Sequence, residues 1–204
     1  MKFRTIIIIG VIVVAIAIVF NSFRGGDADS YVSQVLKERE EKDRFMKTAD
    51  DSPLKDKSNF KGLKYYPPDP RFRIVADLVP VDNPKMVILK TSDGREQRYL
   101  EYAHADFSLD GIRNRLLILE IIDMGPSRGK LFLAFGDETS AVETYGAGRY
   151  LDLVKTPGAA TITLDFNKAY NPYCAYDATF SCPLPPPENL LRIPIKAGEK
   201  NYDH

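Results

Sequence analysis

The sequence predicts a mainly β domain, an antiparallel β-barrel or sandwich of about seven or eight strands, preceded by an N-terminal transmembrane helix and a charged helix. From residue 72 to residue 79 an apolar residue stands at every second position, which is typical of a half-buried strand. Phe72, Ile74, Ala76 and Leu78 alternate with Arg73, Val75, Asp77 and Val79. The dipeptides Asp93-Gly94 and Asp110-Gly111 favour tight hairpin turns between antiparallel strands. The predicted strands cover residues 72–79, 86–91, 97–107, 115–122, 130–135, 150–154 and 160–166.

The composition is that of an ordinary globular chain. Of the 204 residues, 44% are hydrophobic and 27% are charged, which allows a sizeable core. The 28 Lys and Arg balance the 28 Asp and Glu, so there is no overall basic field to attract nucleic acid. Eleven Tyr and eleven Phe with no Trp favour strands and aromatic-lined pockets. We therefore expect one domain after the N-terminal segment and no nucleic-acid partner.

The N-terminus is predicted to anchor the chain in a membrane. Residues 5–23 form an uncharged, largely apolar run of about 19 residues, close to the ~20 that a membrane-spanning helix needs. Lys2 and Arg4 precede it and should stay in the cytoplasm, which places the soluble domain outside. A cleaved signal peptide is the alternative, but the run exceeds the usual ~7–15 apolar residues. We predict an uncleaved anchor over residues 1–24.

Residues 25–58 are predicted to form a linker and a charged helix. Glu38 and Lys42 lie four residues apart in the order that supports a helix. We expect a solvated stalk that holds the domain away from the membrane. A partner-binding helix is the alternative, although its apolar face is narrow. The β-rich globular domain then covers residues 59–204.

A glycine turn followed by an arginine, Gly146–Arg149, lies between two predicted strands. Backbone N–H groups of such a turn and a bidentate guanidinium can bind a carboxylate or a phosphate. The segment is neither a Walker motif nor a dinucleotide-binding motif, because no Gly-Lys-Ser/Thr and no βαβ unit accompanies it. Many Gly-x-Gly pairs only turn the chain, and that interpretation stays open.

The C-terminal segment, residues 165–202, is rich in Pro, Asn and Tyr and has no regular period, which is typical of an ordered irregular segment that builds a site. We predict a pocket for a small polar or anionic ligand, formed by the Glu143–Tyr150 loop and the Asp165–Asn171 turn. The guanidinium would hold the anionic group, the tyrosine rings would form the walls, and the asparagine amides would supply hydrogen bonds. The predicted ligand-binding residues are Tyr145, Arg149, Asn167, Tyr170 and Asn171.

Two other classes of function stay open. A hydrolase or isomerase would use Asp137, Glu143 or Asp165 as acid or base, provided that one of them is desolvated. These carboxylates could equally pair with arginines and fix the loops. A structural or interaction protein of the cell envelope would instead use the charged helix and the proline-rich surface.

Cys174 and Cys182 are the two cysteines, and we predict that they form a structural disulfide. Such a bond persists outside the cytoplasm and would stabilise the short loop by roughly 2–3 kcal/mol. Their spacing is not Cys-x-x-Cys, and only His104 and His204 could add imidazole ligands, so no metal and no cofactor is predicted. A nucleophilic pair of Cys174 with His104 is a further alternative.

Two long stretches also resemble a known family. FGDETSAVETYGAGRYLDL, residues 135–153, and TLDFNKAYNPYCAYDATFSCPLPPPENLLRIPIKAGEK, residues 163–200, are similar to the signature of the domain-of-unknown-function family 1684. SPLKDKSNFKGLKYYPPDPRFRIVA, residues 52–76, is similar to the N-terminal part of that family. The resemblance covers about residues 30–200. It implies a single domain in bacterial and archaeal proteins with no assigned activity or cofactor, and it singles out the glycine turn and the C-terminal segment.

Overall fold

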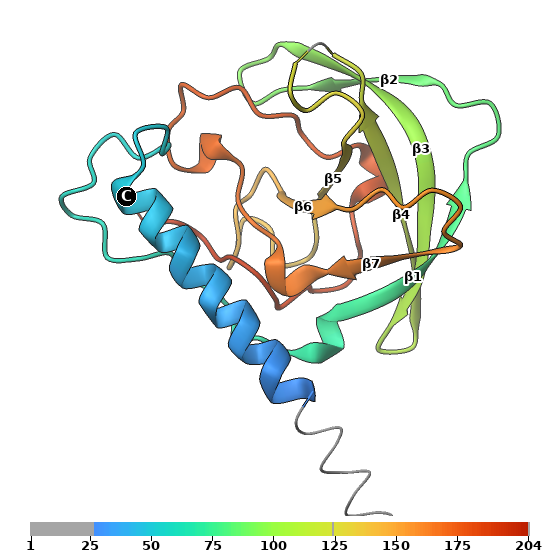
Figure 1. Ribbon diagram of the computed structural model, residues 1–204. Helices are drawn as coiled ribbons and strands as arrows, with labels where there is room; N and C mark the ends of the chain where they lie inside the picture. The colour runs from blue at the N-terminus through green and yellow to red at the C-terminus, as the bar shows by residue number, and fades with distance from the viewer. Residues whose placement is uncertain (1–26, 124, 204) are drawn as a thin grey trace, which may run out of the picture.

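A single antiparallel sheet forms the body of the protein in the computed structural model, which describes residues 27–123 and 125–203 (Figure 1). Within these residues the sheet has seven strands in the order β6-β5-β4-β3-β1-β7, with β2 also paired to β3. The strands are β1 (Arg73–Pro80), β2 (Met86–Lys90), β3 (Glu96–Leu109), β4 (Ile112–Ile121), β5 (Leu131–Phe135), β6 (Arg149–Leu153) and β7 (Thr161–Asp165). The prediction of a mainly β, antiparallel domain is confirmed, and the sandwich alternative is wrong because one curled sheet takes the place of two packed ones.

The sheet curls into a half-barrel because β3 bends. The first part of β3 pairs with β2 and its last part pairs with β1, and the register with β4 shifts between Glu101 and Ala103. A bulge of this kind increases the local twist of a strand. The terminal strands β6 and β7 are thereby brought into contact, and a bridge between Tyr150 and Tyr170 adds to their connection.

The C-terminal segment fills the concave side of the half-barrel (Figure 1). Leu191, Ile193, Ile195 and Ala197 are buried in the main apolar core, while the residues between them are exposed. This alternation lets an irregular segment bury one side against the inner face of the sheet, and apolar burial is the main force that holds it there. Four 3₁₀ turns occur in the described part of the chain: η1 (Pro70–Phe72), η2 (Phe166–Lys168), η3 (Tyr173–Ala175) and η4 (Pro187–Asn189).

Asn189 joins the C-terminal segment to the middle of the sheet. Its side chain is fully buried, and its Oδ1 accepts a hydrogen bond of 2.7 Å from the backbone N–H of Leu117 in β4. Its Nδ2 donates to the carbonyl oxygens of Leu117 at 2.9 Å and of Ala134 at 2.8 Å. The Asn189 amide therefore satisfies three backbone groups that belong to two strands, β4 and β5.

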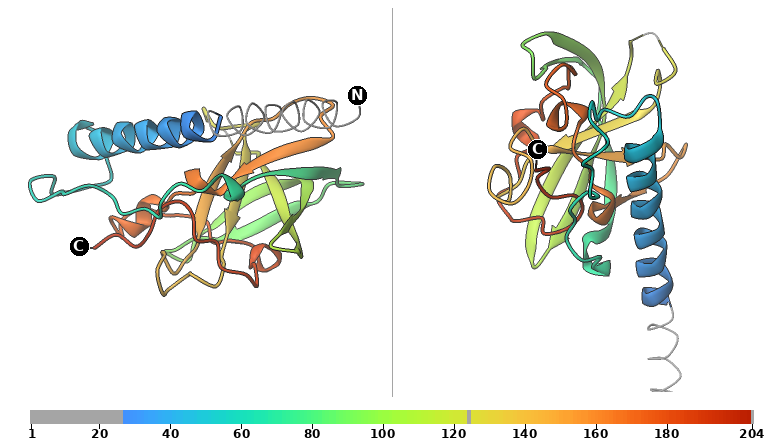
Figure 2. Two further views of the ribbon diagram at one scale, coloured as in Figure 1. Left: turned by 90° about the horizontal axis from the view of Figure 1, so that it is seen from below. Right: turned by 90° about the vertical axis from the view of Figure 1, so that its left-hand side faces the viewer.

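Residues 27–48 form a helix that lies along the domain (Figure 2). Tyr31, Val35 and Met46 are buried, and the Tyr31 hydroxyl donates to Asp165 Oδ1 at 2.7 Å. The prediction that this helix is a solvated stalk is therefore wrong, because the helix packs against the domain. The helix carries few apolar residues, but these residues face the domain. Polar side chains of the helix add hydrogen bonds to the domain.

No helix among residues 27–123 and 125–203 combines the length and the apolar composition needed to cross a membrane. The predicted anchor, residues 1–24 with the membrane contact at 5–23, lies outside the described residues.

Gly148 is required by the packing of the glycine turn. Its φ is +89°, and a Cβ there would lie 2.7 Å from the carbonyl oxygen of Phe135 and 2.5 Å from Pro185 Cγ. Gly158 has a similar φ of +72°, but no described atom lies within 4 Å of its Cβ position. We expect Gly148→Ala to lower the free energy of unfolding by at least about 2 kcal/mol more than Gly158→Ala, because only Gly148→Ala adds overpacking to backbone strain. Urea denaturation of both variants checks this, and equal losses would contradict the packing role.

Candidate functional site

A cleft of about 140 Å³ lies between the N-terminal helix and the C-terminal segment. One wall is a single face of the helix, and the other is the chain from η2 to Tyr170, with Tyr65 between them. Residues at positions i, i+3, i+4 and i+7 share one face of a helix, and the helix residues that line the cleft, positions 35, 38, 39 and 42, have this spacing. The lining residues are Val35, Glu38, Arg39, Lys42, Tyr65, Asn167, Lys168, Ala169 and Tyr170.

Arg39 crosses the cleft and joins its two sides. Its Nη1 donates to the carbonyl oxygen of Tyr66 at 2.8 Å, and its Nη2 donates to that of Asn167 at 3.1 Å. Its Nε is buried and has no hydrogen-bond partner among the described residues. Burial lowers the pKa of Arg39, although the group stays charged at neutral pH. The side chain is thus held in place, while one buried N–H has no acceptor among the described residues.

Two lysines add positive charge to the cleft. Lys42 Nζ lies 2.8 Å from Glu199 Oε2 and 4.8 Å from the centre of the Tyr170 ring. Lys168 Nζ, on the opposite wall, donates to Glu38 Oε1 at 2.8 Å. Both ammonium groups are partly exposed, so each can also meet a molecule that enters the cleft.

Tyrosine rings form the apolar part of the walls. The Arg39 guanidinium carbon lies 4.4 Å from the centre of the Tyr65 ring, a distance at which cation–π attraction operates. The Tyr65 hydroxyl is buried without a described hydrogen-bond partner, and burial raises the pKa of this phenol, so it stays protonated and can donate. Burial also raises the pKa of Tyr170, whose hydroxyl donates to Asp152 Oδ1 at 2.8 Å.

A buried carboxylate lies next to the cleft. Glu199 is 1% exposed, and besides Lys42 it accepts hydrogen bonds from Asn171 Nδ2 at 2.9 Å, from the Asn171 backbone N–H and from the Tyr176 hydroxyl. Asn171 Oδ1 is buried and, within the described part of the chain, unpartnered. This network fixes Lys42 in position, because a buried carboxylate without its cation is costly.

Three of the five predicted ligand-binding residues, Asn167, Tyr170 and Asn171, belong to this region. The Asn167 amide joins η2 to the backbone of Asp69. Its Nδ2 donates to the Asp69 carbonyl at 2.7 Å, and its Oδ1 accepts from the Asp69 N–H at 2.8 Å. Tyr170 presents its ring to Lys42. Asn171 contacts Glu199, behind the cleft, and is fully buried.

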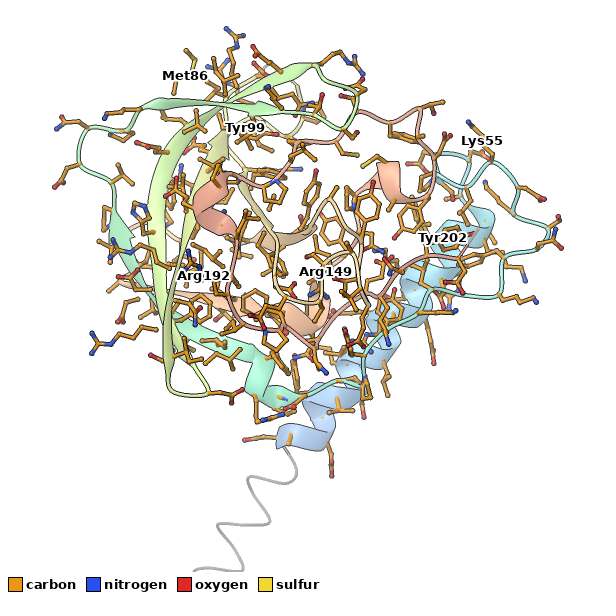
Figure 3. The ribbon with its side chains drawn as sticks, turned by 180° about the vertical axis from the view of Figure 1, so that it is seen from behind. Lys55, Met86, Tyr99, Arg149, Arg192 and Tyr202 are labelled. Carbon is orange, nitrogen blue, oxygen red and sulfur yellow. The ribbon has the colours of Figure 1, made fainter. Side chains whose placement is uncertain are left out.

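Arg149 lies elsewhere, inside the molecule (Figure 3). It is 0% exposed, and its Nη2 forms an ion pair of 2.9 Å with Asp137 Oδ2. The same nitrogen donates to the Ile195 carbonyl at 2.9 Å, while Nη1 donates to the carbonyls of Ala197 and Glu199. The guanidinium therefore binds the backbone of the C-terminal segment. Asp137 is held by the guanidinium and by the Ile195 backbone N–H, which donates to its Oδ1 at 3.2 Å.

The other candidate acids and bases are also paired. Asp165 Oδ1 accepts from the Tyr31 hydroxyl and from the Asn167 N–H at 3.2 Å, which caps η2. Glu143 lies 3.7 Å from Lys196 Nζ and 3.4 Å from Lys200 Nζ. Interaction with the Tyr66 hydroxyl, and to a smaller extent with these two lysines, lowers the pKa of Glu143 below its usual range. A general acid at neutral pH requires a raised pKa instead.

The predicted disulfide between Cys174 and Cys182 is wrong, because both cysteines lie in the described part of the chain and are free thiols. They are nevertheless neighbours, with the Cys174 backbone N–H donating to Cys182 Sγ at 3.1 Å. Tyr145, a predicted ligand-binding residue, lies beside them and points its hydroxyl at Cys174 Sγ, 3.6 Å away.

Sequence reasoning missed Arg39, Lys42, Tyr65 and Glu199. The helical spacing of Val35, Arg39 and Lys42 was the available signal, since it places two cations beside an apolar residue on one face. It could not show that this face meets the C-terminal segment, which is more than a hundred residues away in the chain.

Comparisons with known proteins give a family and a structural relative. The sequence profile of the family described as "Protein of unknown function (DUF1684)" matches residues 58–200. The solution NMR structure of the uncharacterized protein from gene locus rrnAC0354 of Haloarcula marismortui is 39% identical, covers 87% of this chain and 98% of its own, and has a TM-score of 0.65. No curated protein matches. The family match includes the whole sheet, the glycine turn and the C-terminal segment as far as Lys200, and on this basis the chain belongs to the DUF1684 family.

Proposed function

We propose that the protein binds a small anion, with one negative charge and a compact apolar body, in the cleft between the N-terminal helix and the C-terminal segment. It does so outside the cytoplasm, with residues 1–24 as its membrane anchor. The observation that carries the proposal is the position of Arg39: the residue lines the cleft, and its buried Nε has no acceptor among the described residues. A buried donor without a partner costs about 1–3 kcal/mol, which a bound acceptor would recover.

The charge of the cleft favours a monoanion. The charged side chains that line the cleft are three cations, Arg39, Lys42 and Lys168, and one carboxylate, Glu38. Of the cations, Lys42 pairs with the buried Glu199 and Lys168 with Glu38. Arg39 is therefore the lining cation whose hydrogen bonds within the described part of the chain reach carbonyl oxygens and no carboxylate. Hydrogen bonds between a guanidinium and a carboxylate are charge-assisted and roughly twice as strong as neutral ones.

The volume and the apolar walls of the cleft determine the size and the apolar part of the ligand. Its volume of about 140 Å³ is close to the ~150 Å³ of a cavity that holds benzene. Val35, Ala169 and the rings of Tyr65 and Tyr170 supply apolar contact. A short-chain or aromatic monocarboxylate such as benzoate fits both the volume and the charge.

The proposal is tested by calorimetric titration of the full-length protein, purified in a mild detergent, with benzoate and with the neutral isostere benzamide. We expect benzoate to bind at least tenfold more tightly. Arg39→Met should weaken benzoate binding by at least about tenfold, the equivalent of one charge-assisted hydrogen bond. Arg44→Met is the matched control, because Arg44 lies on the same helix but is exposed and does not line the cleft.

Lys168→Met provides a second variant if loss of Arg39 undocks the helix. Lys168 is partly exposed and reaches across the cleft only to Glu38, so the fold should tolerate its loss. We expect a several-fold loss of benzoate affinity in this variant. Equal binding of benzoate and benzamide, or wild-type affinity in both cleft variants, would rule out the proposed anion site.

A further inference from the structure

The two free cysteines are held side by side by the backbone around them. Cys174 lies in η3 and is partly exposed, whereas Cys182 is buried. Cys182 is fixed to the turn between β2 and β3: its N–H donates to Ser92 Oγ at 3.2 Å, and its carbonyl accepts from the Ser92 N–H at 2.8 Å. The Cys174 N–H then donates to Cys182 Sγ at 3.1 Å, so the two residues meet on an ordered scaffold.

The surroundings of the two sulfurs differ. Cys182 is buried in an apolar cluster with Ala134 and Tyr150. Cys174 Sγ, at the edge of this cluster, accepts from the Tyr145 hydroxyl. Hydrogen bonding from the Cys182 thiol, with a smaller contribution from the Tyr145 hydroxyl, lowers the pKa of Cys174 to about 6, and the same interaction raises the pKa of Cys182. A partly exposed thiolate beside a protonated thiol is the arrangement of a nucleophilic cysteine and its resolving partner.

We propose that Cys174 and Cys182 form a thiol–disulfide exchange site whose substrate is the disulfide of a small thiol, with Cys174 as the attacking residue and Cys182 as the resolving residue. This differs from the structural disulfide predicted from the sequence, because the pair would cycle between two thiols and a bond. It is independent of the anion cleft, and none of its residues lines that cleft.

The exchange proceeds in two balanced steps. The Cys174 thiolate attacks one sulfur of the small disulfide, the S–S bond of the substrate breaks, and the leaving thiolate takes a proton from solvent. Cys182 then gives up its proton to solvent and attacks the Cys174 sulfur of the mixed disulfide. The bond between Cys174 and the small thiol breaks, and the leaving thiolate takes a proton from solvent. In total two protein thiols are oxidised to one disulfide, while one small disulfide is reduced to two thiols.

Intact-mass measurement of the reduced full-length protein after addition of glutathione disulfide tests the proposal. The wild type should lose two hydrogens, carry no lasting adduct, and return to its starting mass with excess glutathione. Cys182→Ser should trap one glutathionyl group, because the resolving thiol is gone. Cys174→Ser should acquire this group at least about tenfold more slowly, because its remaining thiol is buried and has a raised pKa.

Three results would overturn the assignment. The first is equal adduct rates in the two serine variants, which would remove the distinction between attacking and resolving residues. The second is a stable mixed disulfide on the wild type. The third is a native wild type that stays unchanged under conditions in which the denatured wild type reacts. The wild-type measurements need no substitution, so they decide the question even if a variant fails to fold.

Discussion

Arg149→Met is expected to lower the free energy of unfolding by about 3–5 kcal/mol, because it leaves the buried Asp137 carboxylate without its cation. The substitution keeps much of the side-chain volume, so the loss reports charge and hydrogen bonding more than a cavity. The carbonyls of Ile195 and Ala197 lose their donor as well, which should loosen the C-terminal segment from the sheet. Urea denaturation of the full-length protein measures the change.

Arg192→Met is the matched control, since Arg192 lies in the same C-terminal segment but is exposed. We expect it to change the free energy of unfolding by no more than about 0.5 kcal/mol. The structural role of Arg149 would be contradicted if Arg149→Met were as stable as this control. A stable Arg149→Met protein with lost benzoate binding would instead place the anion at the glycine turn.

Asn189→Ala should have a comparably large effect, a loss of at least about 3 kcal/mol. Three buried backbone groups, the N–H and carbonyl of Leu117 and the carbonyl of Ala134, would lose their partner, at about 1–3 kcal/mol for each. The released C-terminal segment also shapes one wall of the cleft. Benzoate affinity should therefore fall together with stability.

Asn59→Ala is the control for this change, because Asn59 is exposed. We expect its free energy of unfolding to stay within about 0.5 kcal/mol of the wild type. An Asn189→Ala protein with the stability of Asn59→Ala would show that solvent or another side chain satisfies the three backbone groups, and that the amide does not join the segment to the sheet.

The strands could be predicted from the sequence because their signal is local. The alternation in residues 72–79 and the turns at Asp93-Gly94 and Asp110-Gly111 give β1 and the hairpins at the two ends of β3. The sequence left barrel and sandwich open, because the curl of the sheet depends on the bulge near Ala103 and on the segment that fills the half-barrel.

The site could be predicted only in part. The concentration of Asn and Tyr directs attention to the chain around Tyr170, which forms one wall of the cleft. The sequence predicts a ligand for Arg149 because its local context, a glycine turn, does not show that residues 195–199 fold back onto it and bury it. Arg39 looked like a solvated helix residue for the same reason: its partners are distant in the chain.

The central claim is that a small anion binds in the cleft between the N-terminal helix and the C-terminal segment, and a crystal structure of the full-length protein grown with benzoate tests it most directly. We expect electron density for benzoate in the cleft, with a carboxylate oxygen within hydrogen-bond distance of Arg39 Nε and the ring against Tyr65 or Tyr170. An empty cleft at saturating benzoate, or benzoate bound at the Gly146–Arg149 turn, would contradict the account.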